Sequence, residues 1–331
     1  MGAIGQRFAY AAAVHEPSRF TNLYPHPRHG LWQVLQWKLG LRGPVRHRSE
    51  REPAGLPPVV EVDRKRIASP DPDHVRATWI GHASFLIQVG GWNLLVDPVY
   101  SDHCAPVPLP RLRRKRPPGL PWEDLPPIDL VLITHSHFDH LDLPTLRRLP
   151  GRPRGVVPAG LAQWLARRVP WKVEELDWWQ SLDLGRGLRV TSVPAQHFAA
   201  RNWWDHNRSH WCGWVMCHGN LRVYATGDSG YCPVFAEIGE RLGPMDVSLI
   251  PIGAYEPRWF MQAMHLNPEE AVQVHADVRS RRSLASHWGT FDLTDEPMGE
   301  PPERLARALQ EKGLTHSTFR TLGIGETFTS P

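Results

Sequence analysis

Three histidines and an aspartate follow an apolar run at 130–133 that is typical of a buried strand. Residues two apart in an extended chain point the same way, so His135 and His137 can converge on one metal ion. If the chain then turns into a helix, Asp139 and His140 point toward a second position. Imidazole nitrogen and carboxylate oxygen suit Zn²⁺, with Fe or Mn as alternatives. The competing explanation is a chance polar loop in a chain with 18 His.

Three further residues of ligand type stand at the ends of predicted strands. They are His197, Asp228 and His287, after strands expected at 187–194, 221–225 and 283–286. Repeated arrival of such residues at strand ends is hard to explain as coincidence. The sequence therefore predicts one metal site that is assembled from distant segments.

The pattern His-x-His-x-Asp-His after a hydrophobic strand resembles the metallo-β-lactamase superfamily. Within it, the chain is similar to the N-acyl-phosphatidylethanolamine-hydrolysing phospholipase D family. The matching motifs are Trp-Ile-Gly-His-Ala-Ser at 79–84, Leu-Pro-Pro-Ile-Asp at 125–129, Glu-Leu-Asp-Trp-Trp at 175–179, Gly-Asp-Ser-Gly-Tyr-Cys-Pro at 227–233, Ile-Gly-Ala-Tyr-Glu-Pro-Arg-Trp-Phe-Met at 252–261, Pro-Glu-Glu-Ala at 268–271 and His-Trp-Gly-Thr-Phe at 287–291. The resemblance implies an α/β fold, a four-layer αββα sandwich with two metal ions, preferably zinc, at one edge.

The resemblance also implies a division of the ligands between the two ions. It assigns His135, His137 and His197 to the first ion, Asp139, His140 and His287 to the second, and Asp228 to a bridge between them. Asp139 is expected to serve catalysis as well as binding. Two cations about 3.5–4 Å apart lower the pKa of a shared water, so a bridging hydroxide is the expected nucleophile.

Five more residues are candidates around this site. In the superfamily an aspartate at the position of Asp97 supports the ligands from behind, although an aspartate before proline is also a common turn residue. His82, in a turn between strands, is either a second supporting residue or a structural histidine. Resemblance places His265 at the reaction site, to bind a phosphoryl oxygen or protonate the leaving group; capping a helix is its alternative role. Tyr255 and Arg258 are candidates for substrate binding, and Arg258 could instead pair with a carboxylate.

The implied function is a phospholipase D-type phosphodiesterase that cleaves N-acyl-phosphatidylethanolamine into an N-acylethanolamine and phosphatidic acid. Two divalent ions among five neutral His and two Asp leave residual positive charge, which favours an anionic substrate. The first alternative is a hydrolase of a soluble phosphodiester, ester or lactone. The second is a nucleic-acid-binding or nuclease protein, which the short segment after His287 and the lack of interleaved aromatic residues disfavour.

The 331 residues are expected to form an N-terminal extension at 1–74 and a catalytic domain at 75–331. The extension should contain a short amphipathic helix at 31–39, either packed on the catalytic domain or lying on a membrane, and then an extended arm. A proline-rich loop at 100–123 carries a basic run, Arg111 to Arg116, which either contacts anionic lipid or is solvated. With a formal charge of +4, peripheral membrane binding is one expectation, and a homodimer is one of the open oligomeric states.

Two features of the composition indicate a cytoplasmic location. The four cysteines form no Cys-x-x-Cys pair and are expected to be reduced. No signal peptide or spanning segment is evident.

Overall fold

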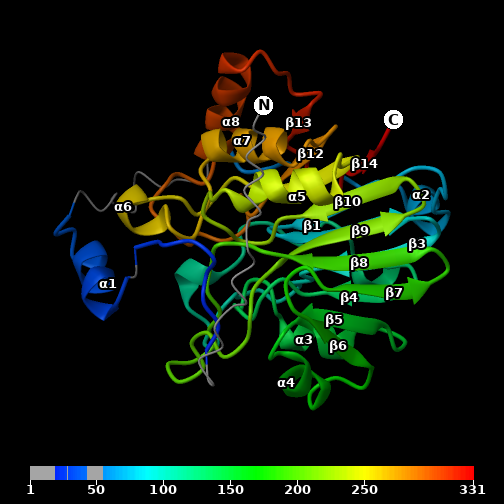
Figure 1. The fold of residues 1–331 in the computed structure, drawn as a ribbon, viewed down its shortest axis with the longest axis horizontal. Coiled ribbons are helices and arrows are strands. Elements are labelled where there is room, and N and C mark those ends of the chain that lie inside the picture. The colour runs from blue at the N-terminus through cyan, green and yellow to red at the C-terminus, as the bar shows by residue number, and fades with distance from the viewer. Residues whose placement is uncertain (1–18, 28, 43–54) are drawn as a thin grey trace, which may run out of the picture.

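Two seven-stranded mixed sheets form the framework of the computed structural model, which describes residues 19–27, 29–42 and 55–331 (Figure 1). In spatial order, the first sheet contains β14 (Thr327–Thr329), β1 (Arg76–Gly81), β2 (Ser84–Val89), β3 (Trp92–Val96), β4 (Leu130–Leu132), β5 (Arg154–Pro158) and β6 (Val173–Leu176). The second contains β13 (Phe319–Arg320), β12 (Ser283–Ser286), β11 (Val247–Pro251), β10 (Leu221–Ala225), β9 (Gly213–His218), β8 (Leu188–Val193) and β7 (Ser181–Gly185).

The two sheets share one pairing scheme. In the first, neighbours from β14 to β3 are antiparallel and neighbours from β3 to β6 are parallel. In the second, neighbours from β7 to β10 are antiparallel and neighbours from β10 to β13 are parallel. The fold thus consists of two related halves, and the carboxyl ends of β4, β10 and β12 all belong to parallel segments.

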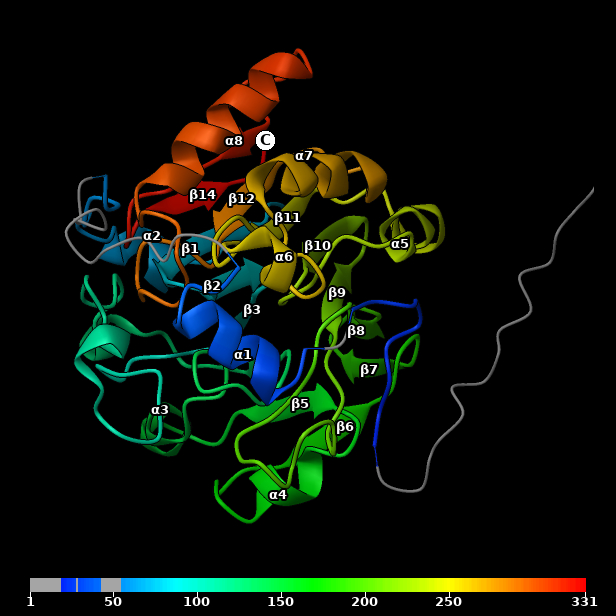
Figure 2. The same cartoon turned by 90° about the vertical axis from the view of Figure 1, so that its left-hand side faces the viewer.

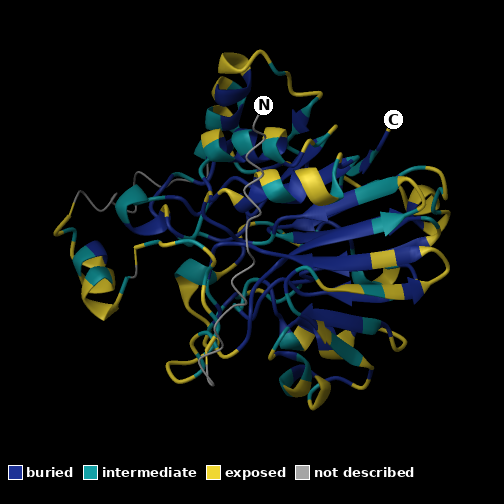
Figure 3. Ribbon diagram, viewed as in Figure 1, coloured by how far each residue is buried: buried dark blue, intermediate teal, exposed yellow. Residues whose placement is uncertain are grey.

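Helices cover the outer faces of both sheets (Figures 1 and 2). They are α2 (Arg64–Ala68), α3 (Leu143–Arg148) and α4 (Ala162–Ala166) on the first sheet, and α5 (Val234–Leu242), α7 (Pro268–Asp277) and α8 (Glu300–Glu311) on the second. Alternation in β2 shows why both faces are covered: Phe85 and Ile87 pack between the sheets, whereas Leu86 packs under the helices. The central strands of both sheets are accordingly buried in Figure 3, whereas the edge strands β6 and β7 are partly exposed, and the predicted αββα sandwich is confirmed.

Local residue types account for where several of these elements begin or end. Gly90 and Gly91 both have positive φ, 56° and 77°, as a tight hairpin turn between β2 and β3 requires. Asn267 caps α7: its side chain accepts the N–H of Glu270, whose carboxylate accepts the N–H of Asn267 in return. The arm expected before residue 74 is interrupted by α2, which Asp63 caps, and residues 43–54 of that arm lie outside the described residues.

The predicted amphipathic helix is α1 (Leu31–Lys38). Its buried Trp37 packs on Phe260, with ring centroids 5.2 Å apart, and donates its indole N–H to Asp295. Its other side is exposed, including Leu31 at 74% and Trp32 at 59%. The helix therefore docks on the catalytic part of the chain and still presents an apolar face.

Part of the basic run is engaged within the chain, whereas Arg113 and Lys115 are exposed. One 3₁₀ turn (Pro110–Leu112) overlaps the start of the run, and a second (Trp122–Asp124) follows the run. Arg114 is buried and donates to the carbonyls of Val99 and Ser101 at 2.7 and 3.1 Å, while Arg111 donates to the carbonyls of Asp292 and Thr294. Composition does not reveal which arginines of a basic run hold a loop together, and contact of the exposed residues with anionic lipid stays a prediction.

All four cysteines are free, as predicted. Among the described residues, no helix is long and apolar enough to cross a bilayer.

Candidate metal centre

The structure brings all seven predicted ligands together. Residues 135–140 follow β4, Asp228 follows β10 and His287 follows β12, so parallel strands deliver them to one edge. His197 reaches the same place from the end of β8. Every one of the seven except His137 and Asp139 is buried below 5% exposure.

His135, His137 and His197 form what we call the three-histidine group. His137 Nδ1 lies 2.8 Å from His135 Nε2 and 3.2 Å from His197 Nε2. The three ring nitrogens lie within 4.8 Å of one another, which is close enough for one ion to contact all three.

The carboxylate group contains His82, Asp139, His140 and His287. Asp139 Oδ2 lies 3.0 Å from His82 Nε2, 3.3 Å from His287 Nε2 and 3.7 Å from His140 Nε2. His82 therefore contacts Asp139 directly and is itself one of the residues that could hold a metal ion here.

Asp228 lies between the two groups. Its Oδ2 atom is 3.2 Å from the Nε2 atoms of both His140 and His287, and 3.8 Å from His197 Nε2. One carboxylate therefore reaches ligands of both groups, as the bridging role requires.

Several buried polar atoms at this convergence have no hydrogen-bond partner. They are His140 Nε2, His287 Nε2, His265 Nδ1 and Asp228 Oδ1. Leaving such atoms unsatisfied is costly, and cations bound by nitrogen and oxygen would satisfy them. The residues present therefore fit metal ions of the zinc type.

Asp97 holds the metal motif from behind. Its carboxylate accepts from the Thr134 N–H at 2.7 Å, from the Thr134 hydroxyl at 2.6 Å and from His140 Nδ1 at 2.7 Å. Because His140 donates through Nδ1, its Nε2 atom is left to face Asp228. This geometry supports the predicted supporting role and does not favour a simple turn residue.

The electrostatics of the two groups differ. Burial lowers the pKa of His137 to about 3 and that of His197 to about 4. Burial also acts against the charged form of His287, but Asp228 and Asp139 raise its pKa to about 9. The pKa of His140 is raised for the same reason, by Asp228, Asp139 and Asp97 against the effect of burial.

Asn22 is a site residue that sequence analysis missed. Its side-chain amide donates to the carbonyl of His197 at 2.8 Å and accepts the His197 N–H at 3.1 Å. It also accepts the indole N–H of Trp211 at 2.9 Å, while His197 Nδ1 donates to the Met264 carbonyl. Asn22 therefore clamps the backbone of a ligand from a segment 175 residues away.

Arg201 was missed as well. Its Nη1 atom donates to the carbonyls of Ser136 and Leu141 at 2.9 and 2.7 Å, and its guanidinium lies 3.8 Å from the centre of the Phe138 ring. Burial lowers its pKa to about 10. The side chain braces the backbone of the metal motif from outside.

His265 lies beside the convergence, with Nδ1 3.9 Å from Asp228 Oδ2 and a side chain 13% exposed. Arg258 binds Glu270 through two bonds of 2.8 and 2.9 Å and donates to the His265 carbonyl at 3.0 Å. Tyr255 is buried and donates its hydroxyl to Glu300. These contacts favour positioning roles for Arg258 and Tyr255, whose contact with substrate stays a prediction.

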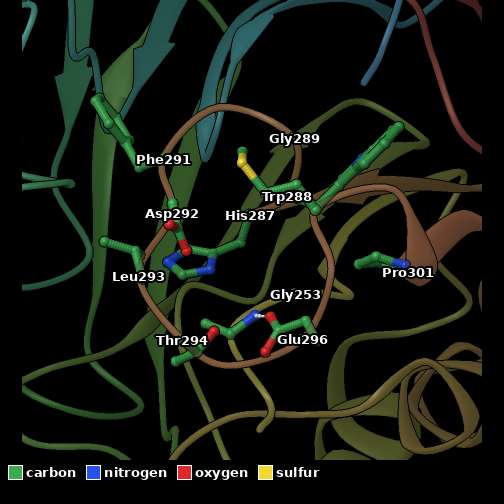
Figure 4. A pocket seen from close by; sticks show the side chains of 12 residues that line it. Gly253, His287, Trp288, Gly289, Phe291, Asp292, Leu293, Thr294, Glu296 and Pro301 are labelled. Atoms are coloured by element: carbon green, nitrogen blue, oxygen red, sulfur yellow. Dashed lines mark hydrogen bonds between the residues drawn. The ribbon is translucent and has the colours of Figure 1, made fainter. Parts of the chain in front are cut away.

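The loop after His287 encloses a pocket lined by Trp288, Phe291 and Leu293 (Figure 4). Glu296 closes it by accepting the N–H of Ala254 at 2.6 Å. The centre itself uses unusual backbone geometry, because the supporting and ligating residues His82, Asp97 and His287 have φ of 54°, 42° and 59°. Such left-handed conformations are uncommon outside glycine.

Comparison with known proteins agrees with this geometry. A family described as "Beta-lactamase superfamily domain" matches residues 92–288. An "N-acyl-phosphatidylethanolamine-hydrolyzing phospholipase D 1" of Caenorhabditis elegans is 39% identical over 264 residues, covering 76% of this chain and 74% of the relative. An uncharacterised protein of Mycobacterium tuberculosis is 37% identical over 330 residues, covering 95% of this chain and 86% of the relative.

Among solved structures, Igni18, described as a novel metallo hydrolase from Ignicoccus hospitalis, superposes with a TM-score of 0.61 at 22% identity. The match covers 78% of this chain and 99% of that one. At this identity the similarity concerns the fold.

Proposed function

Because the chain belongs to the metallo-β-lactamase superfamily and is a metal-dependent hydrolase, we propose that it is a phospholipase D-type phosphodiesterase. Its proposed substrate is N-acyl-phosphatidylethanolamine, cleaved to an N-acylethanolamine and phosphatidic acid. The observation that carries the proposal is the position of Asp228 Oδ2 between two groups of ligands. The Caenorhabditis elegans relative, which is named for hydrolysis of this lipid, supports the choice of substrate.

Seven residues would hold two ions, with zinc preferred: the three-histidine group for one, Asp139, His140 and His287 for the other, and Asp228 for both. Bound there, the ions would lower the pKa of a shared water and offset charge on the phosphoryl oxygens. Asp139 and Asp228 are the only carboxylates among these ligands, so four positive charges would exceed two negative ones. That excess favours an anionic substrate such as a phosphodiester.

His265 is the histidine that remains near the phosphate once the ligands are assigned. Its Nδ1 atom has no partner and its side chain is partly open, so it can meet a substrate oxygen. Burial lowers its pKa well below the usual value, which leaves the imidazole neutral before substrate binds. An anionic phosphate beside it would raise that pKa and favour proton transfer to the leaving alkoxide.

The test is a direct comparison of two substrates on one preparation. Activity should be measured on N-acyl-phosphatidylethanolamine in mixed micelles and on a soluble nitrophenyl phosphodiester, with metal content determined on the same sample. We expect close to two metals per chain and a higher kcat/KM for the lipid. A preference for the soluble compound, or for an ester or lactone, would favour the second candidate, a hydrolase of a soluble substrate.

Peripheral membrane binding accompanies the proposed function. The exposed side chains of α1, among them Leu31 and Trp32, form an apolar face on a helix that docks on Phe260 and Asp295. The basic run contributes little to this face, because Arg111 and Arg114 are engaged within the chain. Light scattering of the purified protein would determine whether it is a monomer or a homodimer.

A further inference from the structure

The connection from β8 to β9 contains a short loop whose two ends are tied together. The N–H of Asn207 donates to the Ala199 carbonyl at 2.6 Å, and Asn207 Oδ1 accepts the Ala199 N–H at 3.1 Å. Inside the loop, Asp205 Oδ1 accepts the N–H groups of Arg201 and Asn202 at 2.9 and 2.7 Å. Asp205 Oδ2 also accepts from the side-chain amide of Asn202 at 3.2 Å, so these bonds fix the conformation of the loop and use both oxygens of the carboxylate internally.

We call residues 199–207 the tryptophan loop, because its tip presents two adjacent indoles to solvent. Trp203 is 81% exposed and Trp204 is 65% exposed. They are the two most exposed tryptophans among the described residues. A loop held by internal hydrogen bonds keeps both rings outward, so the exposure is built into its conformation.

The opposite side of the same loop touches the metal motif. Arg201, two residues before Trp203, makes the bonds to the Ser136 and Leu141 carbonyls described above. The tip and the metal centre are therefore parts of one connected structure, and a surface that meets the tip lies close to the centre.

The tryptophan loop and α1 project from the same edge of the molecule. In Figure 1 both extend to the left of the sheets, the loop as the yellow-green segment between β8 and β9. Figure 2 looks onto that edge and shows both facing the viewer. Two separate elements that carry exposed apolar residues thus project from one edge of the molecule.

We propose that the tryptophan loop is a membrane anchor that acts together with α1, with Trp203 and Trp204 lying among lipid headgroups. An indole has an apolar body and one N–H donor, and therefore favours the boundary between water and hydrocarbon. The choice of lipid as partner rests on the proposed function: a scissile phosphodiester of a phospholipid lies at headgroup depth. An anchor at that depth brings the metal centre to the bond.

The experiment measures binding of the full-length protein to vesicles that contain no N-acyl-phosphatidylethanolamine. Co-sedimentation is carried out with phosphatidylcholine vesicles and with vesicles that include one fifth phosphatidylglycerol. Trp203→Ser/Trp204→Ser should weaken binding by at least about tenfold, since two large apolar side chains no longer leave water. The matched control, Trp203→Phe/Trp204→Phe, should retain most of the affinity because the rings still enter the interface.

Metal content and thermal midpoint of each variant confirm that the fold and the centre are intact. Equal vesicle affinity of the wild type and the serine variant overturns the proposal, and so does a wild type that does not bind. Conversion of a dimer to a monomer by the serine variant also overturns it, because the surface would then join two copies. Since no substrate is present, failure of the proposed activity would leave the binding result readable.

Discussion

The three-histidine group and the carboxylate group meet at Asp228, yet the chain holds them differently. In the first, neutral amide and carbonyl groups fix the ligand backbone and ring, as Asn22 and the Met264 carbonyl do for His197. In the second, carboxylates of Asp97 and Asp139 contact the imidazoles directly. The imidazoles of the three-histidine group are therefore neutral and can bind a metal directly. In the carboxylate group the imidazoles whose pKa is raised are protonated, and a metal must displace those protons.

The largest expected effect comes from the residue that the two groups share. Asp228→Asn should remove metal from both groups together and lower kcat/KM by roughly 10³-fold or more, since charge stabilisation worth several kcal/mol is lost. Metal content of the purified variant is the measurement. Retention of one full equivalent of metal would show that Asp228 serves a single group.

Substitution of His265 should lower the rate of the reaction without removing metal from either group. We expect His265→Gln to keep both metals while kcat falls by about 10²–10⁴-fold. The loss should shrink for a nitrophenyl phosphodiester, whose leaving group needs no proton. An equal loss on both substrates would indicate phosphate binding instead, and loss of metal would remove His265 from the chemistry.

Substitutions of two supporting residues should affect the two groups separately. Asn22→Ala should weaken metal binding in the three-histidine group by about 10–100-fold, and Asp97→Asn should do the same in the carboxylate group. Chelator competition gives the affinities, and Co²⁺ spectra identify which group is loaded. Asn207→Ala is the control, because it removes the side-chain bonds to the Phe20 carbonyl and to the Ala199 N–H and none to His197.

Equal effects of Asn22→Ala and Asn207→Ala would mean that Asn22 acts only by docking the N-terminal segment. If either of the two variants lost metal equally from both groups, the two groups would not bind metal independently of each other.

The smallest effect is a difference in the pH dependence of metal loading. In the metal-free protein the pKa of His287 is about 9, so below that pH a metal must displace its proton. The pKa of His137 is about 3 and that of His197 about 4, so no such competition exists for them near neutral pH. Affinity of the carboxylate group should therefore fall by up to about tenfold per unit as pH drops from 8 to 5.

The measurement is metal content after equilibration at each pH, with Co²⁺ spectra to identify the group. The first metal released should come from the carboxylate group. Release of metal from the three-histidine group first would contradict this prediction.

The ligands could be predicted because their types and their places at strand ends are both visible in the sequence. The αββα arrangement came from resemblance, and alternation within strands such as β2 was consistent with it. Asn22 and Arg201 could not be predicted, since each acts through backbone groups of residues far away in the chain. The same limit applies to the burial of Arg114, because the sequence of a basic run does not distinguish a buried arginine from a solvated one.

The left-handed backbone at His82, Asp97 and His287 has a consequence for the amount of protein in a cell. Each such conformation costs of order 1–3 kcal/mol, and ligand atoms without a polar partner add to that cost. Bound metal offsets both by binding only the folded state. A cell short of metal would therefore unfold and degrade a larger fraction of these molecules, and abundance would fall along with the activity of each one.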